Sequence, residues 1–479
     1  MLVTLAKPAR RACDPRQARH DAAMRYHFSG VGGAGMSPLA RLLASRGYAV
    51  QGSDRAFDAG HKQAERDELV AAGVEVLPHD GQAITAAVDC CVHSAAVEAD
   101  TPELRRARDL AVPCLARSQL LHQVVAEGRP GVAVAGTSGK SSVVGMLAWI
   151  CRCLEHPATI LGGAPLALGD THHMGCFVAG GSQDPVIAEA CESDGSLVGY
   201  RPAIGLIHNI SRDHDELDGL RAQFAAFAVG CARLLVNAAC PVARAVGADH
   251  PAVSCYGGPE GLEIRTLGPQ RAQGRLVLAD GRPVDLDLPQ PGRHQVDNAA
   301  AALAVAAALG LDPVAAAAAL SSYPGIARRF QCLGHSPDGI RVIDDYAHNA
   351  DKIQAVVAAA RLAGGRLLTV FQPHGYGPAR FLRAELKALW PRILGPEDRL
   401  CYAPIYDAGG TVRRDISAAD LAADLPGLAT CVADHQTLLD WVASTVRPGD
   451  TVLIMGARDP ALGHLARRVW VAVGNEGED

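Results

Sequence analysis

The sequence has few aromatic residues, little net charge and no long apolar segment. Phe, Trp and Tyr make up 4% of its 479 residues, which disfavours a binding surface built from aromatic platforms. A formal net charge of −6 provides no basic field for a polyanion, so we expect no nucleic-acid partner. The longest apolar stretch, 299–311, is shorter than the ~20 residues that a membrane-spanning helix needs. We therefore expect no membrane segment.

Cysteine pairs and targeting signals are also missing. The 14 cysteines include no Cys-x-x-Cys pair, which favours buried free thiols in a reducing compartment over disulfides. His172, His173 and Cys176 lack a second ligand pair, so we predict no zinc site there. Residues 1–24 carry several arginines without the apolar core of a signal peptide, and we interpret them as a loose leader. We expect a cytoplasmic protein.

The rest of the composition is that of a globular chain with several domains. Hydrophobic residues make up 49% and charged residues 20%, and the length suggests about three domains. Strand-like and helix-like runs alternate, which is typical of α/β domains with parallel sheets. The segment 257–291 is punctuated by Gly and Pro and predicts short antiparallel strands. Breaks at 128–131 and 321–325 divide the chain into the predicted domains 25–127, 128–322 and 323–479.

A glycine-rich loop near the N-terminus is the first motif that carries chemistry. Gly30-Val31-Gly32-Gly33-Ala34-Gly35 follows the expected strand 26–29, and Asp54 ends the next strand. Such a loop lets a diphosphate approach the backbone amides at a helix N-terminus. The pattern fits a nicotinamide dinucleotide and a nucleotide sugar equally well, and a purely structural turn is a further alternative.

A second loop, Gly136-Thr137-Ser138-Gly139-Lys140-Ser141-Ser142, joins the buried strand 132–135 to a helix. It is a shortened P-loop, because Val134 stands where the first glycine usually lies. Its amides would surround phosphate oxygens, Lys140 would neutralise the β- and γ-phosphates, and the Ser141 hydroxyl would bind Mg²⁺. Two such loops on separate domains indicate ATP on one and a phosphorylated substrate on the other, which weakens the dehydrogenase interpretation.

Lysine is rare, so few side chains can supply a phosphate-binding ammonium group. Five of the 45 basic residues are lysines, namely Lys7, Lys62, Lys140, Lys352 and Lys387. A structural explanation for Lys140 is weak, because a lone lysine in this loop otherwise has little reason to be there.

An ordered series of motifs resembles the Mur ligase family, in particular its alanine-adding and murein-tripeptide branches. The series spans about 25–460 and comprises 27–37 with 52–54, 136–142, 189–194, 209–214, 292–298, 327–330, 344–349 and 371–374. The resemblance implies a Rossmann-like N-terminal domain for a UDP-sugar, a central ATPase domain and a Rossmann-like C-terminal domain that closes over the site. It also implies a monomer or weak homodimer.

The reaction that this resemblance implies is ATP-dependent amide formation in peptidoglycan precursor synthesis. The carboxylate of a UDP-N-acetylmuramate-type nucleotide sugar would take the γ-phosphate of ATP. The amine of an amino acid, by default L-alanine, would then attack the acyl phosphate. Mg²⁺ would offset the repulsion between the carboxylate and the triphosphate.

The resemblance also carries roles over to residues of this chain. Its catalytic residues would be Lys140, Glu189, His214, Arg329 and His348. ATP would be bound by Gly136, Thr137, Ser138, Gly139, Lys140, Ser141, Ser142, Asn298, Arg329 and Asp345. Mg²⁺ would be held by Ser141, Glu189 and His214. The substrates would contact Gly30, Gly32, Gly33, Ala34, Gly35, Met36, Ser53, Asp54, Ser94 and His374, the last of these through the amino acid.

Ordinary structural interpretations stand beside these roles. Outside its motif His214 would be a loop histidine, and Asn298 would be a polar residue at a helix start. Arg328 and Arg329 could form a solvated charged pair. Glu189 ends an apolar strand, where a carboxylate needs a partner or an ion, so a ligand role is favoured there.

Departures from the family pattern gather near the expected amine pocket. Gly375 and Pro378 stand where the alanine-adding enzymes usually have arginines, and their absence removes cations that would recognise a small amino acid's carboxylate. Further departures are Ser138 for His, Ala350 for Pro, Gly410 for an acid, Arg458 for Gly, and the segment 117–120. We therefore hypothesise a changed amine acceptor. The alternatives are a murein-tripeptide ligase or other paralogue, a non-catalytic UDP-sugar sensor and a nicotinamide oxidoreductase.

Overall fold

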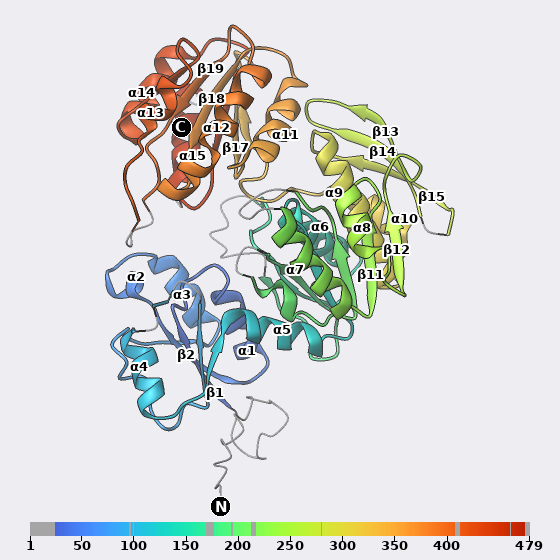
Figure 1. Ribbon diagram of the computed structural model, residues 1–479, viewed down its shortest axis with the longest axis vertical. Helices are drawn as coiled ribbons and strands as arrows, with labels where there is room; N and C mark the ends of the chain where they lie inside the picture. Colours follow the sequence, from blue (N-terminus) through green and yellow to red (C-terminus); the bar gives the residue numbers. More distant parts are fainter. Residues whose placement is uncertain are drawn as a thin grey trace, which may run out of the picture.

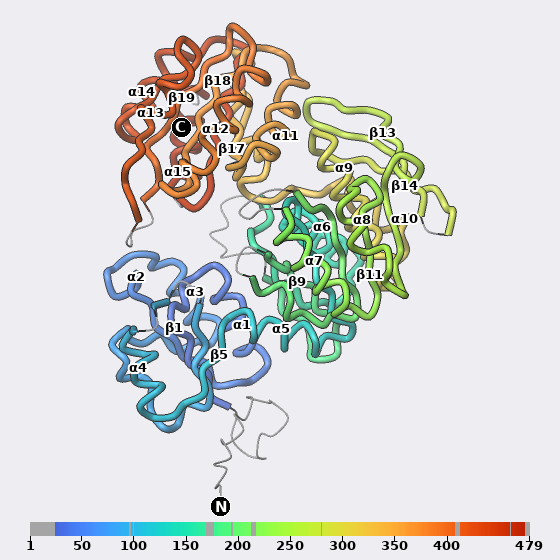
Figure 2. Tube along the Cα trace, viewed as in Figure 1, coloured from blue at the N-terminus to red at the C-terminus, as the bar shows by residue number. Residues whose placement is uncertain are grey.

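The computed structural model describes residues 24–94, 97–98, 100–168, 177–192, 195–211, 217–278, 280–407, 412–459 and 461–474. Three α/β bodies follow one another along the chain. Figure 1 shows the N-terminal body in blue, the central body in teal to yellow and the C-terminal body in orange to red. The trace in Figure 2 shows the central body beside the other two, so that elements from all three face a common region.

The N-terminal domain is built on a five-stranded parallel sheet of order β3-β2-β1-β4-β5. Ser29 at the end of β1 pairs with Ser53 on β2 and with His93 on β4, so these three strands end level with one another. The loops that follow these strands therefore lie at one edge of the sheet. Its elements are β1 (Arg25–Ser29), α1 (Ser37–Ser45), β2 (Ala49–Ser53), α2 (Arg55–Asp58), α3 (Gln63–Ala71), β3 (Glu75–Val76), β4 (Cys90–His93), α4 (Pro102–Asp109) and β5 (Cys114–Ala116).

The central domain has a seven-stranded sheet of order β12-β11-β10-β6-β9-β7-β8, parallel except for β8. The helix α5 (Arg117–Glu127) leads into β6 (Gly131–Ala135), α6 (Lys140–Cys153), β7 (Thr159–Leu161), β8 (Phe177–Val178), β9 (Val186–Ala190), the 3₁₀ helix η2 (Ser196–Gly199) and β10 (Ile204–Ile207). The sheet is completed by α7 (Leu217–Gly230), β11 (Arg233–Asn237), α8 (Pro241–Gly247) and β12 (Val253–Tyr256). A small antiparallel sheet follows, with β13 (Leu262–Leu267), β14 (Ala272–Val277) and β15 (Pro283–Leu288), and then α9 (Arg293–Ala308) and α10 (Pro313–Leu320).

The C-terminal domain has a six-stranded sheet of order β16-β17-β21-β18-β19-β20, in which β16 alone is antiparallel to its neighbour. Its elements are β16 (Gln331–His335), β17 (Arg341–Asp345), α11 (Ala350–Arg361), β18 (Leu367–Gln372), α12 (Tyr376–Ile393), β19 (Arg399–Tyr402), α13 (Ala418–Ala423), β20 (Ala429–Cys431), α14 (His435–Thr445), β21 (Thr451–Gly456) and α15 (Ala461–Val473). Helices α12 and α11 pack against each other over this sheet.

Small side chains bring the two helices beside the central sheet close together. Helix α9 packs on α6, and its residues Ala299, Ala300, Ala301 and Ala302 are completely buried. Tyr323 and Ile326 join the same core, and the side chain of Ile326 lies over Gly145 of α6. The central core therefore extends past the predicted boundary between residues 322 and 323.

The expected α/β class is confirmed, including the antiparallel strands within 257–291. The expected strands 26–29, 132–135, 186–190 and 203–207 correspond to β1, β6, β9 and β10. Helix α6 begins at Lys140, because the left-handed Gly139 turns the chain directly into the helix.

Other expectations concern thiols and membranes. The twelve cysteines in the described part of the chain are free thiols. None of the described helices has the length and apolar character that crossing a bilayer requires. The leader 1–24 (apart from Met24) and the His172, His173 and Cys176 group lie outside the described residues.

A buried polar cluster supports the edge of the N-terminal sheet. Glu103 is completely buried, with the Nδ1 of His79 at 2.9 Å and the Oγ of Ser53 at 3.0 Å from its Oε1. His27 lies in the same cluster, with its Nδ1 3.2 Å from the side-chain nitrogen Nε2 of Gln51. Burial lowers the pKa of His27 to about 4, although Glu103 acts in the opposite direction. His27 is therefore neutral at pH 7.

We expect this histidine to make folding stability depend on acid. Its pKa is about 6.5 when unfolded and about 4 when folded, so the unfolded state binds more protons between these values. Lowering the pH from 6.5 to 4 then removes on the order of 1–3 kcal/mol of stability. Urea unfolding of the wild type and His27→Gln at pH 7.0, 6.0 and 5.0 measures how much of the acid-dependent loss of stability comes from His27. The variant is expected to lose less stability on acidification, and parallel pH curves would contradict the assignment.

Candidate nucleotide and substrate site

The phosphate loop 136–142 lies at the centre of the middle sheet. It follows β6, which pairs with β10 on one side and β9 on the other, so both flanking strands end beside it. Gly139 has φ +82°, a left-handed conformation that glycine adopts without strain. A Cβ there would stand 2.4 Å from the Oδ1 of Asn298 and 2.9 Å from the Cδ2 of His208. The sequence thus needs glycine here for both conformation and space.

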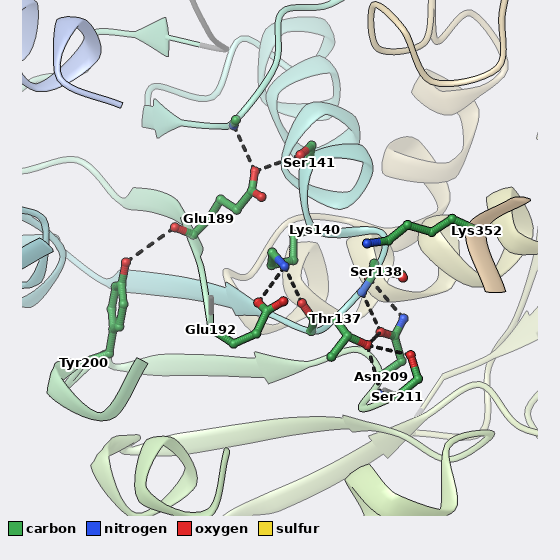
Figure 3. A network of polar contacts seen from close by, with 12 residues as sticks. Thr137, Ser138, Lys140, Ser141, Glu189, Glu192, Tyr200, Asn209, Ser211 and Lys352 are labelled. Atoms are coloured by element: carbon green, nitrogen blue, oxygen red, sulfur yellow. Dashed lines mark hydrogen bonds and ion pairs between the residues drawn. The ribbon is translucent and has the colours of Figure 1, made fainter. Parts of the chain in front are cut away.

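Asn209, just after β10, holds the loop in shape. Its Oδ1 accepts hydrogen bonds from the Thr137 hydroxyl at 2.9 Å and the Ser138 amide at 2.8 Å. Its Nδ2 donates to the Ser138 carbonyl at 3.0 Å, and Figure 3 shows the amide facing this turn. Asn209 belongs to a motif in the sequence, but the residues alone gave it no role. The pairing of β10 with β6 reveals that role.

Lys140 is buried and ion-paired beneath the loop. Its Nζ lies 2.7 Å from Glu192 Oε2 and donates to the Gly136 carbonyl at 2.6 Å. Burial alone would lower the lysine pKa, but the carboxylates of Glu192 and Glu189 outweigh burial and raise it. The ammonium group therefore stays charged. Glu192 was in the acidic segment of the sequence and had no predicted role.

Glu189 on β9 joins the loop to the segment after β7. Its Oε2 accepts from the Ser141 hydroxyl and from the Gly163 amide, each at 2.9 Å. A Cβ on Gly163 would lie 2.6 Å from this oxygen, so glycine is required there. A carboxylate beside a hydroxyl is a donor set that fits Mg²⁺, which usually keeps several waters and takes its other ligands from phosphates. The third predicted ligand, His214, lies outside the described residues.

A cavity of about 440 Å³ runs from the phosphate loop to the C-terminal domain. Ser138, Gly139 and Ser142 line it from the loop, and Asn298 lines it from α9. The C-terminal domain contributes Arg329 and Asp345, so the predicted ATP residues of two domains share one space. Sequence reasoning gave no role to several other lining residues, among them His208, His294, Gln295, Asp297, Asp351 and Lys352.

His208 orients Asn298, one of the predicted ATP-binding residues. The His208 Nδ1 lies 2.8 Å from the Tyr256 hydroxyl, and its ring also hydrogen-bonds the side chain of Asn298. Asn298 in turn donates to the Gln295 side chain at 3.3 Å. Burial lowers the pKa of His208 to about 4, so a neutral ring connects Tyr256 to Asn298 at pH 7. Neutral partners fix the amide of Asn298 without adding charge to the cavity.

The two neighbouring arginines have different roles. Arg328 is anchored, with 19% of its side chain exposed. Its Nε lies 3.3 Å from Asp344 Oδ2, and its Nη2 donates to the Gly456 carbonyl at 2.7 Å. The interpretation of a solvated pair is therefore wrong for Arg328. Both guanidinium groups lie over the Tyr346 ring, 5.3 Å from its centre for Arg328 and 4.8 Å for Arg329, but Arg329 also lines the cavity.

Asp345, at the end of β17, accepts from the amides of Phe330 and Ala347, each at 2.6 Å. Burial raises its pKa to about 6, while Arg329 opposes this shift.

Arg458 has φ +69°, a conformation in which the usual glycine would be unstrained. Its amide nitrogen lies 3.3 Å from the Tyr346 hydroxyl, which links it to the ring under Arg329.

The first glycine loop and Asp54 lie together at the edge of the N-terminal sheet. The Gly32 amide donates to Asp54 Oδ2 at 2.9 Å, while Asp54 Oδ1 caps α2. The carbonyl of Ser53 accepts from the amides of Gly30 and Val31, and its hydroxyl is buried in the Glu103 cluster. Ser53 therefore supports the loop from within, as does the buried Met36. Ser94 directly follows β4 at the same sheet edge.

A second cavity connects this loop to Glu189. It measures about 160 Å³ and is lined by Ala34, Gly35 and Arg117 on one side and by Gly163 and Glu189 on the other. A Cβ on Gly35 would stand 3.1 Å from the Arg117 side chain, so the guanidinium lies against the loop. Glu189 therefore faces the N-terminal loop and also contacts the phosphate loop.

His348 follows β17 and His374 follows β18, the two strands on either side of β21 in the third sheet. Their ring centres are 4.7 Å apart, and both side chains are nearly buried. Gly375 caps α12 with φ +146°, a conformation that disfavours the arginine usual in the alanine-adding branch. Gly410 lies outside the described residues. The predicted residues thus form an N-terminal group, a group around the cavity that the central and C-terminal domains share, and this histidine pair.

Comparisons with known proteins match all three domains. The catalytic domain of the Mur ligase family matches residues 25–129, the Mur ligase middle domain 134–306, and the Mur ligase glutamate ligase domain 328–458. The UDP-N-acetylmuramate–L-alanine ligase of Rubrobacter xylanophilus is 35% identical over 91% of this chain and 97% of its own. The enzyme of the same name from Kineococcus radiotolerans is 35% identical over 91% and 93%.

Solved structures agree with these matches. The UDP-N-acetylmuramate–alanine ligase of Thermotoga maritima superposes with a TM-score of 0.73 at 25% identity, covering 93% of this chain and 98% of its own. A murein peptide ligase from Psychrobacter arcticus shares the fold, with a TM-score of 0.67 at 21% identity over 95% and 100% of the two chains. The motifs, the three domains and these matches agree, and the chain belongs to the Mur ligase family.

Proposed function

We propose that this chain is an ATP-dependent ligase that joins L-alanine to UDP-N-acetylmuramate. The observation that carries the proposal is the position of Glu189. Its carboxylate hydrogen-bonds Ser141 of the phosphate loop and lines the cavity of the N-terminal glycine loop. A phosphate donor on one loop and a nucleotide sugar on the other would therefore meet at this residue. The relatives that match over nine-tenths of the chain carry the name of this activity.

The proposed chemistry has two steps, and this chain's residues would position each reactant. In the first, a carboxylate oxygen of the sugar's lactyl group attacks the γ-phosphorus and ADP leaves. In the second, the uncharged amine attacks the acyl carbon, inorganic phosphate leaves with that oxygen, and the amine loses a proton. Mg²⁺, bound through Ser141 and Glu189, would supply charge neutralisation between the two anions.

Lys140 would exchange partners as ATP binds. In this structure its ammonium group is balanced by Glu192, which keeps a buried charge paired. Phosphate oxygens beside the loop amides would draw the same ammonium toward the β- and γ-phosphates. Arg329, on the C-terminal domain, would reach the nucleotide from the opposite wall of the cavity. Closure of that domain then completes the site.

A different amine acceptor is the second candidate within the same chemistry. The observation that favours it is the start of α12, where Gly375 and Pro378 supply no arginine, so that the cation in contact with His348 comes from Lys352 of α11. A free amino acid presents a carboxylate that an arginine would bind. A peptide amine, as in murein-tripeptide ligases, carries its carboxylate farther from the reacting nitrogen.

An acceptor screen tests the proposed activity. Purified protein with ATP, Mg²⁺ and UDP-N-acetylmuramate should release ADP only when an acceptor is added. We expect the strongest release with L-alanine among single amino acids, and Lys140→Ala should reduce it by at least 10²-fold because the phosphate cation is lost. Release only with a peptide amine would select the second candidate, and no acceptor-dependent release would contradict both.

The hydrogen bonds from Asn209 to the phosphate loop predict that ATP binding depends on this side chain. Asn209→Ala leaves the Ser138 amide and carbonyl without their side-chain partner and should cost about 1–3 kcal/mol of loop stabilisation. We expect the KM for ATP to rise about tenfold or more, with the KM for the nucleotide sugar changing less than twofold. Asn237→Ala, at another polar lining residue of the same cavity, serves as the comparison. Unchanged ATP kinetics in Asn209→Ala would show that the loop keeps its shape without this amide.

A further inference from the structure

Among the described residues that line the ATP cavity, Lys352 is the one lysine. It lies in the first turn of α11, whose start is fixed by Asn349. The Asn349 Oδ1 accepts from the Lys352 amide at 3.1 Å. The backbone of Lys352 is thus held at the end of the helix that faces the central domain (Figure 1).

A neutral acceptor positions the ammonium group. Lys352 Nζ lies 3.4 Å from His348 Nε2, while His348 Nδ1 lies 2.9 Å from the Tyr346 carbonyl. A carbonyl can only accept, so Nδ1 carries the proton and Nε2 is free to accept from the lysine. The imidazole packs edge-to-face against His374, which fixes its plane. This contact directs the ammonium group through a hydrogen bond to the imidazole.

The side chain points at the phosphate loop. Figure 3 shows Lys352 extending from α11 toward Ser138, on the side of the loop opposite Glu192. Lys352, Ser138 and Gly139 line the same cavity. Lys140 reaches the loop from beneath, and Lys352 faces it from across the cavity. The two lysines therefore come from different domains.

The charges around the cavity favour a phosphate ligand for the Lys352 ammonium group. ATP brings several negative charges, while the Lys140 charge is shared with Glu192. Among the described lining residues, the other charged groups are Arg329, Asp297, Asp345 and Asp351. Burial raises the pKa of both Asp297 and Asp345. A strongly hydrated ammonium is suited to phosphate oxygens as a point charge, and it has no complementary partner in a purine ring.

We infer that Lys352 is a phosphate-contacting residue that the C-terminal domain supplies to ATP, held in place by His348. The inference rests on the proposed function, because it assumes that ATP occupies this cavity. Since Lys352 moves with the third domain, its contact also attracts that domain toward the loaded phosphate loop. ATP binding and domain closure are then linked through one charge.

Binding of a nucleotide series tests this role. Equilibrium titrations with ATP, ADP and adenosine, in the presence of Mg²⁺, compare the wild type with Lys352→Met and Lys352→Arg. Lys387→Met is the matched control, because Lys387 is exposed on α12 and pairs with Asp424. We expect Lys352→Met to raise the Kd for ATP about tenfold and the Kd for adenosine less than twofold. Lys352→Arg should stay within about threefold of the wild type for ATP.

The outcomes separate the inference from the function beneath it. Wild-type affinity for ATP in Lys352→Met would overturn the inference and leave the ATP site intact. An equal loss for ATP and adenosine in Lys352→Met, with no rescue by Lys352→Arg, would assign the lysine to structure alone and also overturn it. If the wild type itself bound adenosine and ATP no better than Lys140→Ala does, the proposed ATP site would fail and the inference with it.

Discussion

The carboxylate of Glu189 connects the two halves of the site. It accepts from Ser141 and Gly163, and it lies where the phosphate loop and the cavity of the N-terminal loop meet. A partly buried carboxylate is stabilised when it accepts hydrogen bonds, and these two contacts to Oε2 fix its position before any ligand binds. The absence of a side chain at Gly163 is part of the same constraint, because a methyl group would collide with this oxygen. The proposed transfer of phosphate depends on that geometry.

Around this carboxylate, neutral groups hold the candidate binding residues in place. Asn209 shapes the phosphate loop, His208 orients Asn298, and His348 directs Lys352. Neutral hydrogen-bond partners fix the direction of these side chains without adding a charge of their own. The charged groups come from separate bodies, with Lys140 on the central domain and Arg329 and Lys352 beyond it. A triphosphate would therefore bind the central domain and attract the C-terminal domain toward it.

Glycines and runs of apolar residues in the sequence predicted the strands and turns that depend on neighbouring residues alone. The run before Gly136 forms β6, and the alternating segment after Gly257 forms the small antiparallel sheet. Glu192, Asn209, His208 and Lys352 were in view but had no role, because their partners lie on other strands or another domain. The order β10-β6-β9 places Asn209 and Glu189 on opposite sides of the loop, and no local pattern encodes that order. Arg328 was misread for the same reason, since its partner Asp344 belongs to the third sheet.

The most direct test of the central claim follows one oxygen atom. UDP-N-acetylmuramate labelled with ¹⁸O in its carboxylate, incubated with ATP, Mg²⁺ and the accepted amine, is analysed through the inorganic phosphate released. Activation of the carboxylate by ATP predicts one labelled oxygen in the phosphate for each amide formed. Phosphate without label, or amide formation without ADP, would contradict the account.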